Sequence, residues 1–124
     1  DLSMNSYNHY AFGAIVGFFY RRLAGIAPAT PGFRTIAARP LWYAAVGRVS
    51  ASYDSVVGTI VAETDGDATG LTRFKLTIPA NTTAEVELPG DGWRQGSLSL
   101  HSDGAMTRIT VDAGRYDFRK SGEE

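Results

Sequence analysis

The sequence predicts a mainly β protein, an antiparallel β-sandwich preceded by one buried helix. Apolar and polar residues alternate in several short stretches after residue 70, and turn motifs such as TDGDATG, PANTT and PGDGW separate those stretches. Short strands with turns at roughly 8–12-residue spacing are typical of a sandwich or barrel. Before residue 26, in contrast, the apolar residues recur at helical spacing. A length of 124 residues suits one domain, or one domain with an attached element.

The predicted helix lies in the segment SMNSYNHYAFGAIVGFFYRRLAGI, residues 3–26. Asn5 or Ser6 is suited to cap its start, and Gly25 marks its end. A helix that is apolar nearly all round is buried on most sides. The apolar side chains here cover most of the helix surface: Tyr7, Ala11, Phe12, Ala14, Ile15, Val16, Phe18, Phe19 and Leu23. The helix therefore needs partner helices, which the remaining residues do not obviously supply.

The apolar run of this segment is too short to span a membrane. Tyr10 to Tyr20 is a run of eleven residues without a charge, followed by Arg21 and Arg22. A spanning helix needs about 20 apolar residues. A secretory signal carries its positive charge before the apolar run rather than after it. The sequence therefore predicts a buried helix and no membrane partner.

Charge and cysteine content exclude further classes of protein. The net charge is −1, and acidic and basic residues are interspersed along the chain. Nucleic-acid-binding proteins usually show a basic patch or stripe, so we expect no nucleic-acid partner. The chain has no cysteine, which excludes disulfides and thiolate metal sites and leaves the compartment undetermined. We expect no cofactor and no metal site.

The strands after the helix are predicted from alternation. The apolar members of the alternating pairs and triplets are Phe74, Leu76 and Ile78; Val86 and Leu88; Leu98 and Leu100; Ile109 and Val111; and Tyr116 and Phe118. Two longer candidate strands precede them, FRTIAARP and LWYAAVGRVSASYDS, with mixed patterns. We expect one of these two to cover a sheet edge or to contact a neighbouring domain. The loop APATPG separates both from the helix.

Four successive segments carry a resemblance to a known family: MNSYNHYAFGAIVGFFYRRLAGI, PGFRTIAARP, SYDSVVGTI and FKLTIPANTTAEVELP, the last expected to be a hairpin. Through them the chain resembles, from Met4 to about Phe118, the C-terminal part of bacterial α-L-rhamnosidases, which are inverting glycoside hydrolases. The resemblance implies that residues 1–26 hold the last helix of the catalytic (α/α)6 barrel. Residues 27–32 are then a linker, and residues 33–124 a C-terminal β-sandwich domain. Thr64 departs from the pattern, because tryptophan is frequent there in the family.

The function that this resemblance implies is hydrolysis of terminal α-L-rhamnose from glycosides. Inverting hydrolysis needs a carboxylic acid and a carboxylate about 6.5–9.5 Å apart. In the resembled family both are glutamates on barrel loops, whereas the first glutamate here is Glu63, inside the predicted sandwich. We therefore expect a fragment without the catalytic pair, inactive alone. Its expected partners are the remainder of the parent enzyme and, through the missing barrel, a rhamnosyl substrate.

His9 is the one residue for which the resemblance implies substrate binding. In the family, the histidine of an Asn-His-Tyr motif lines the rhamnose pocket and hydrogen-bonds the sugar, and Asn8, His9 and Tyr10 match that motif. A neutral imidazole is able both to donate and to accept a hydrogen bond. From the residues alone, a polar side chain at the start of a helix is the simpler explanation of His9.

Three other polar features have simpler structural explanations. Residues 65–67 resemble the start of a calcium loop, but a hairpin turn explains them better. Residues 81–83 match the N-glycosylation pattern, although turn chemistry is the better explanation. His101 beside Asp103 lacks a nearby nucleophile arrangement, so we expect a surface loop there.

Three aromatic residues leave a second function open. Trp42, Tyr43 and Trp93 are of the type that forms a platform for a sugar ring, although core or interface positions are commoner for such residues. An exposed trio would favour a free-standing β-sandwich module that binds carbohydrate or another partner. The two hypotheses, enzyme fragment and free-standing module, therefore differ in where these aromatics lie.

Overall fold

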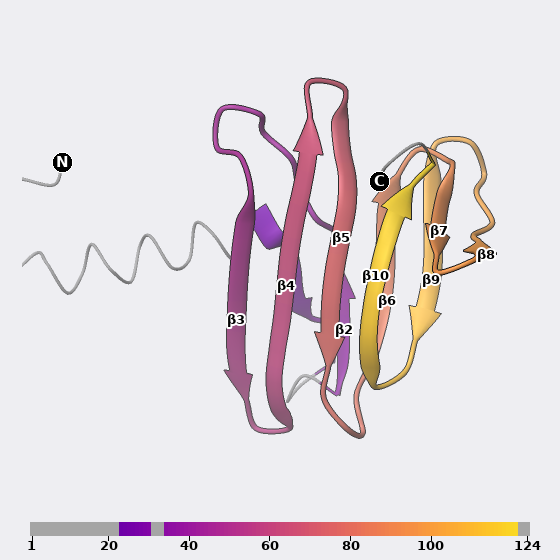
Figure 1. The fold of residues 1–124 in the computed structure, drawn as a ribbon. Helices are drawn as coiled ribbons and strands as arrows, with labels where there is room; N and C mark the ends of the chain where they lie inside the picture. The colour runs from indigo at the N-terminus through magenta and orange to yellow at the C-terminus, as the bar shows by residue number, and fades with distance from the viewer. Residues whose placement is uncertain (1–22, 31–33, 122–124) are drawn as a thin grey trace, which may run out of the picture.

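The computed structural model describes residues 23–30 and 34–121, and these form two facing β-sheets (Figure 1). The smaller sheet has the strand order β1-β2-β6-β9, and the larger has the order β3-β4-β5-β10-β7-β8. The strands are β1 Ile26–Pro28, β2 Thr35–Ala38, β3 Val49–Ser55, β4 Gly58–Asp67, β5 Gly70–Ile78, β6 Thr83–Pro89, β7 Trp93–Gln95, β8 Leu98–Ser99, β9 Met106–Val111 and β10 Gly114–Lys120. The predicted mainly β, sandwich-like fold is confirmed.

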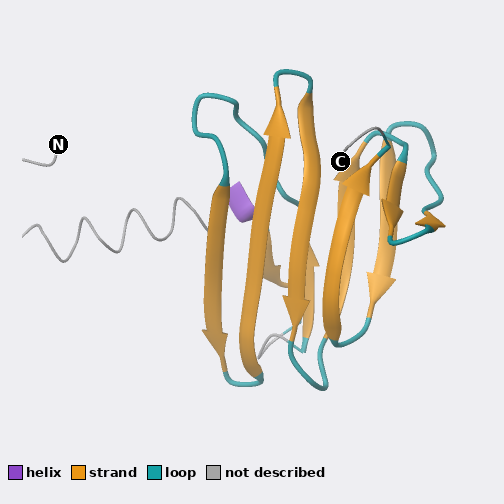
Figure 2. Ribbon diagram, in the orientation of Figure 1, coloured by secondary structure: helices purple, strands orange, loops and turns teal. Residues whose placement is uncertain are grey.

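The predicted helix lies almost wholly outside the described residues. Within the described part of the chain, only Leu23 and Ala24 have helical backbone (Figure 2), so the helix stays a prediction. Gly25 follows them with φ +76°, a left-handed conformation that glycine adopts readily at the end of a helix. Among the described residues, no helix has the length and apolar character that crossing a membrane requires.

The alternation in β5 and β6 directs one side chain set inward and the other outward, as predicted. In β5, Phe74, Leu76 and Ile78 are buried, while Lys75 is exposed. In β6, the buried residues alternate with glutamates in the same way. Because successive side chains of a strand point to opposite faces, this pattern fixes which face of each sheet lies against the other.

The core between the sheets contains aromatic and aliphatic residues from the larger sheet and aliphatic residues from the smaller one. Phe118 of β10 stacks on Phe74 at a ring-centroid distance of 6.3 Å and on Tyr116 at 5.9 Å. The smaller sheet contributes Ile36, Ala38, Ala84, Val86, Leu88 and Val111 to the same cluster. One core therefore holds both sheets together.

The prediction of a purely antiparallel sandwich is wrong at one strand pair. β2 pairs with β6 in parallel, from Thr35 opposite Thr83 to Ala38 opposite Val86, whereas the other strand pairs of the described residues are antiparallel. A parallel pair needs a long crossover rather than a hairpin. The strands β3, β4 and β5 provide that crossover, and all of them belong to the larger sheet.

The predicted long strand LWYAAVGRVSASYDS is half wrong. Only Val49–Ser55 is a strand, β3, and it lies at the edge of the larger sheet. The residues before it form a loop, because the Trp42 indole is hydrogen-bonded to the Asp67 carbonyl and Gly47 has φ +80°. The other candidate, FRTIAARP, contributes β2.

Two further local predictions are corrected. The segment IPANTTAEVELP is no hairpin: β5 belongs to the larger sheet and β6 to the smaller, so residues 79–82 cross between the sheets. The Thr83 amide, at the end of this crossing, donates to the Arg34 carbonyl and so enters the smaller sheet beside β2. Leu98 does not point into the core but is 60% exposed, because β8 is a two-residue edge strand that pairs only with β7.

Candidate functional site

His9, the predicted sugar-binding residue, lies outside the described residues, so its role stays a prediction. The polar groups that the structure does describe gather on the two outer faces of the sandwich.

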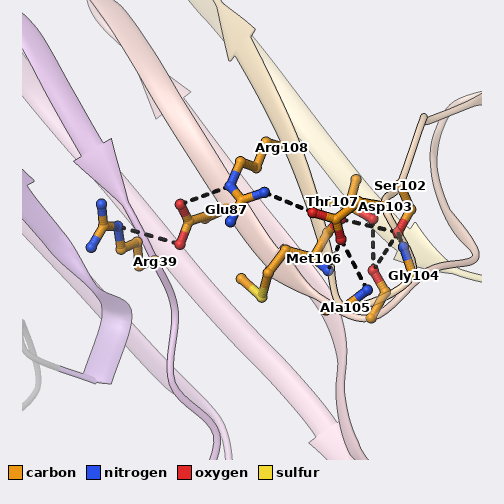
Figure 3. Close-up of polar contacts among 10 residues, drawn as sticks. Arg39, Glu87, Ser102, Asp103, Gly104, Ala105, Met106, Thr107 and Arg108 are labelled. Carbon is orange, nitrogen blue, oxygen red and sulfur yellow. Dashed lines mark hydrogen bonds and ion pairs between the residues drawn. The ribbon is translucent and has the colours of Figure 1, made fainter.

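On the outer face of the smaller sheet, a row of ionic contacts links alternating arginines and carboxylates (Figure 3). Glu87 of β6 lies directly opposite Arg108 of β9, and the Arg108 Nε donates to Glu87 Oε2 at 3.2 Å. The other oxygen of the same carboxylate is 3.5 Å from Nε of Arg39, which follows β2. These three side chains border a surface hollow of about 270 Å³.

This row of ionic contacts ends at Asp103, in the loop before β9. Arg108 donates from Nη1 to Asp103 Oδ2 at 3.0 Å, and the backbone amides of Met106 and Ala105 donate to Oδ1 at 2.8 and 2.9 Å. These two amides, followed by Arg108, lower the pKa of Asp103. Glu87 and Asp103 in turn raise the pKa of Arg108. His101 in the same loop is exposed, as the surface-loop prediction expects.

On the outer face of the larger sheet, Asp117 of β10 lies between two arginines. Arg73 of β5 holds both carboxylate oxygens, with Nε at 2.9 Å from Oδ1 and Nη2 at 2.7 Å from Oδ2. Arg119 donates to Oδ2 from Nη2 at 3.0 Å. The Arg73 hydrogen bonds, aided by those of Arg119, lower the pKa of Asp117 to about 2. Asp117 is therefore ionised at neutral pH.

These carboxylates are suited to hold arginines in place and unsuited to donate a proton. The general acid of a glycoside hydrolase needs a raised pKa so that it is protonated at working pH. The pKa values of Asp117 and Asp103 are shifted in the opposite direction. Among residues 23–30 and 34–121, no group of three or more His, Cys, Asp or Glu residues is arranged to hold a metal ion.

The three aromatic residues do not form one sugar platform. Trp93 is 1% exposed in the core, and its indole donates to the Pro89 carbonyl at 2.7 Å. Trp42 is half-buried against the turn between β4 and β5, where its indole is 3.0 Å from the Asp67 carbonyl. Tyr43 alone is largely exposed. The core explanation is confirmed for Trp93, and the free-standing sugar-binding module loses the feature that would favour it.

The turn explanation of residues 81–83 is confirmed, whereas residues 65–67 are the end of strand β4 and the hairpin turn lies at residues 68–69. Asp65 pairs with Arg48 at 3.1 Å, and Asp67 accepts hydrogen bonds from the amide and hydroxyl of Thr69 inside the β4–β5 turn. Thr69 thereby lowers the pKa of Asp67. Asn81 has φ +62°, the left-handed conformation that asparagine tolerates in turns.

The two arginine–carboxylate clusters were not singled out from the sequence. The members that lie in strands occupy outward-facing positions of the alternation, whereas Arg39 follows β2 and Asp103 lies in a loop. The partners, however, come from strands distant in sequence, such as Arg73 and Asp117, and strand register decides which side chains meet. The sequence shows the alternation of charged residues, but alternation alone does not give the strand register that decides which of them pair.

Comparison with known proteins identifies the family. Residues 25–101 match the model of the bacterial alpha-L-rhamnosidase C-terminal domain. An alpha-L-rhamnosidase of Formosa agariphila is 37% identical over 91 residues, which are 73% of this chain and 10% of that protein.

Solved structures agree with this match. The Streptomyces avermitilis alpha-L-rhamnosidase, crystallised in complex with L-rhamnose, superimposes with a TM-score of 0.68 and 31% identity over 94% of this chain and 12% of its own. The alpha-L-rhamnosidase from Dictyoglumus thermophilum shares the fold with a TM-score of 0.74 at 24% identity, over 94% of this chain and 14% of its own. The chain thus spans about a tenth of the length of these proteins. It belongs to the family of bacterial alpha-L-rhamnosidase C-terminal domains.

Proposed function

We propose that this chain is the C-terminal part of an α-L-rhamnosidase that removes terminal α-L-rhamnose from glycosides by an inverting acid/base mechanism. The observation that carries the proposal is the family match over residues 25–101, in a chain that covers only 10% of its Formosa relative. The catalytic carboxylates then belong to the remainder of the enzyme, which is the partner of this domain. The lowered pKa values of Asp117 and Asp103 support this division, because neither residue is suited to be the general acid.

Within this proposal, residues 1–26 are the last helix of the catalytic barrel, residues 27–32 the linker, and residues 33–124 the sandwich. Two observations support a buried helix that ends just before the sandwich. The apolar side chains of residues 7–23 are distributed all round a helix, which is typical of a helix with partners on most sides. Gly25 has the left-handed φ that ends a helix, whereas β1, Ile26–Pro28, already pairs with β2, so the first strand of the sandwich lies within the predicted linker.

The same proposal gives His9 a hydrogen bond to the rhamnosyl group in the barrel pocket. Losing a hydrogen bond costs about 0.5–1.5 kcal/mol, and leaving a buried partner unsatisfied costs about 1–3 kcal/mol. In the complete enzyme, His9→Ala should therefore lower kcat/KM for rhamnosides by roughly ten- to a hundredfold, since each 1.36 kcal/mol is a factor of ten. The melting temperature should change little.

Activity assays test the proposal at two levels. The complete enzyme should hydrolyse p-nitrophenyl α-L-rhamnoside with inversion, whereas the 124-residue chain alone should not. Phe18→Ala is the control for His9→Ala, because removing an apolar side chain of the helix should lower the melting temperature and spare the rate per folded molecule. Activity that copurifies with the 124-residue chain would refute the fragment proposal, and wild-type kinetics of the His9→Ala variant would refute the role of His9.

A further inference from the structure

A run of six apolar residues lies in a loop at one end of the sandwich. The residues are LWYAAV, 41–46, and five of the six are exposed, with Leu41 at 45%, Tyr43 at 56% and Val46 at 40%. Consecutive exposed apolar residues of this kind are unfavourable in a soluble domain unless they serve a function. Contiguous apolar patches mark surfaces that are covered by a partner.

The structure holds this apolar loop in a defined conformation. The Trp42 indole donates to the Asp67 carbonyl, and its ring lies against Gly66, where a side chain would not fit. The Val46 amide donates to the Tyr43 carbonyl at 2.9 Å, which closes a turn. The half-buried Trp42 thus anchors the loop to the β4–β5 turn, while its apolar neighbours remain exposed. A pre-formed surface loses less conformational entropy when a partner covers it.

The apolar loop also lies beside the point where the described chain begins. The Leu41 amide donates to the Leu23 carbonyl at 2.8 Å, and the Arg39 amide donates to the Gly25 carbonyl at 2.9 Å. The backbones approach so closely that a side chain on Gly25 would collide with the Arg39 carbonyl. Leu23 and Ala24 are themselves buried. Leu23, the first residue that the structure describes, is therefore held beside Leu41.

We propose that residues 41–46 form the docking surface for residues 10–20 of the same chain. That segment, YAFGAIVGFFY, carries no charge and ends only two residues, Arg21 and Arg22, before the described Leu23. The apolar loop next to Leu23 has matching chemistry to cover one face of this segment, and the rest of its surface is left for the partner helices proposed above. The contact joins the sandwich to the segment in front of it, and it does not depend on the proposed rhamnosidase activity.

Amide hydrogen exchange of the 124-residue chain tests this contact. Peptides from residues 10–20 should be protected in the wild type. The triple variant Leu41→Ser, Tyr43→Ser, Val46→Ser should increase their exchange by at least about tenfold, because exchange reports local opening. The variant keeps Trp42, so peptides from β5 and β10 should retain wild-type protection. Unprotected residues 10–20 in the wild type, or equal exchange in the variant, would overturn the proposal.

A matched control removes apolar side chains elsewhere on the surface. Val56 is 89% exposed and Leu98 is 60% exposed, and both lie outside the apolar loop. The double variant Val56→Ser, Leu98→Ser should leave the exchange of residues 10–20 unchanged. Repeating the measurement over a range of chain concentrations tests the occupant. Protection that is independent of concentration supports contact within one chain, whereas protection that disappears on dilution would assign the surface to a second copy and overturn the proposal.

Discussion

The two sheets fill their shared core with different kinds of side chain. The larger sheet presents stacked rings to the core, with Phe118 between Phe74 and Tyr116, while the smaller sheet presents aliphatic residues such as Val86. A buried aromatic ring removes more apolar surface from water than a valine side chain does. Removing a buried ring of the larger sheet should therefore cost more stability than removing an aliphatic side chain of the smaller sheet.

The outer faces of the two sheets also differ, because their arginines are exposed to water to different extents. Asp117 and Glu87 each lie between two arginines, but the arginines of the larger sheet, Arg73 and Arg119, are 26% and 33% exposed. Those of the smaller sheet, Arg39 and Arg108, are 69% and 58% exposed. Ion pairs between exposed side chains contribute little, since water screens them and ordering long side chains costs entropy. A carboxylate between two arginines should therefore stabilise the larger sheet and contribute little to the stability of the smaller sheet.

The largest effect is expected from truncating the aromatic stack. Phe118→Ala removes a ring that is 0% exposed, and such a change costs about 3–5 kcal/mol of unfolding free energy. Val86→Ala, its counterpart in the smaller sheet, should cost about 1.5–3 kcal/mol, because it removes fewer buried carbons. Urea unfolding of both variants at neutral pH measures the difference. Equal losses would contradict the unequal contributions of the two sheets.

A smaller effect is expected from the half-buried ion cluster. Asp117→Asn leaves Arg73 and Arg119 without their shared counter-charge, and it should cost about 1–2 kcal/mol at neutral pH after solvent screening is considered. The pKa of Asp117 is lowered from 3.8 to about 2 in the folded state. Its contribution is therefore present above about pH 4 and is lost as the pH falls towards about 2. The stability difference between wild type and variant should shrink over that interval.

The exposed cluster provides the control for this measurement. Glu87→Gln alters a carboxylate whose two arginines are mostly in water, so it should cost about 0.5 kcal/mol or less. Urea titrations of both variants at about pH 7 and about pH 2.5 complete the comparison. A loss for Glu87→Gln as large as that for Asp117→Asn would show that exposure of the arginines does not decide their contribution.

The alternation of apolar and polar residues was enough to predict β5, β6, β9 and β10, because the period of two is a local property of the chain. The connections were not predictable in this way. TDGDATG has the composition of a turn, yet β4 continues through Asp67 with a bulge between Asp65 and Gly66. Gly66 suits this course because the Trp42 ring occupies the space that its side chain would need. That contact joins residues 24 positions apart, which no local pattern encodes.

The sequence was enough to predict the family and the type of domain, but it did not reveal the ionic clusters of the candidate site. The family emerged from long matched segments such as FKLTIPANTTAEVELP. The Arg73–Asp117 pair, in contrast, depends on the register of β5 against β10 and spans 44 positions. Charged residues on the outer faces were predictable from alternation, while their pairing required the tertiary structure.

Effects of opposite sign are expected at two buried threonines, one in each sheet. Thr64 of β4 is 2% exposed, and its hydroxyl has no hydrogen-bond partner among the described residues. Thr107 of β9 is 0% exposed, but its hydroxyl donates to the Gly90 carbonyl at 2.8 Å. A buried hydroxyl without a partner carries a desolvation cost, whereas a bonded one contributes about 0.5–1.5 kcal/mol.

The same substitution should therefore have opposite signs in the two sheets. Thr64→Val replaces an unpartnered hydroxyl by a methyl group of similar shape between Val49 and Phe74, its neighbours in register, and should raise the unfolding free energy by about 1 kcal/mol. Thr107→Val removes a donor from a carbonyl that also accepts from Ser102, and should lower it by about 1 kcal/mol. Urea unfolding of the two variants side by side measures both changes. If both move in the same direction, volume and rotamer effects outweigh hydrogen bonding at these sites, and the hydroxyl of Thr64 is not the weak point of the larger sheet.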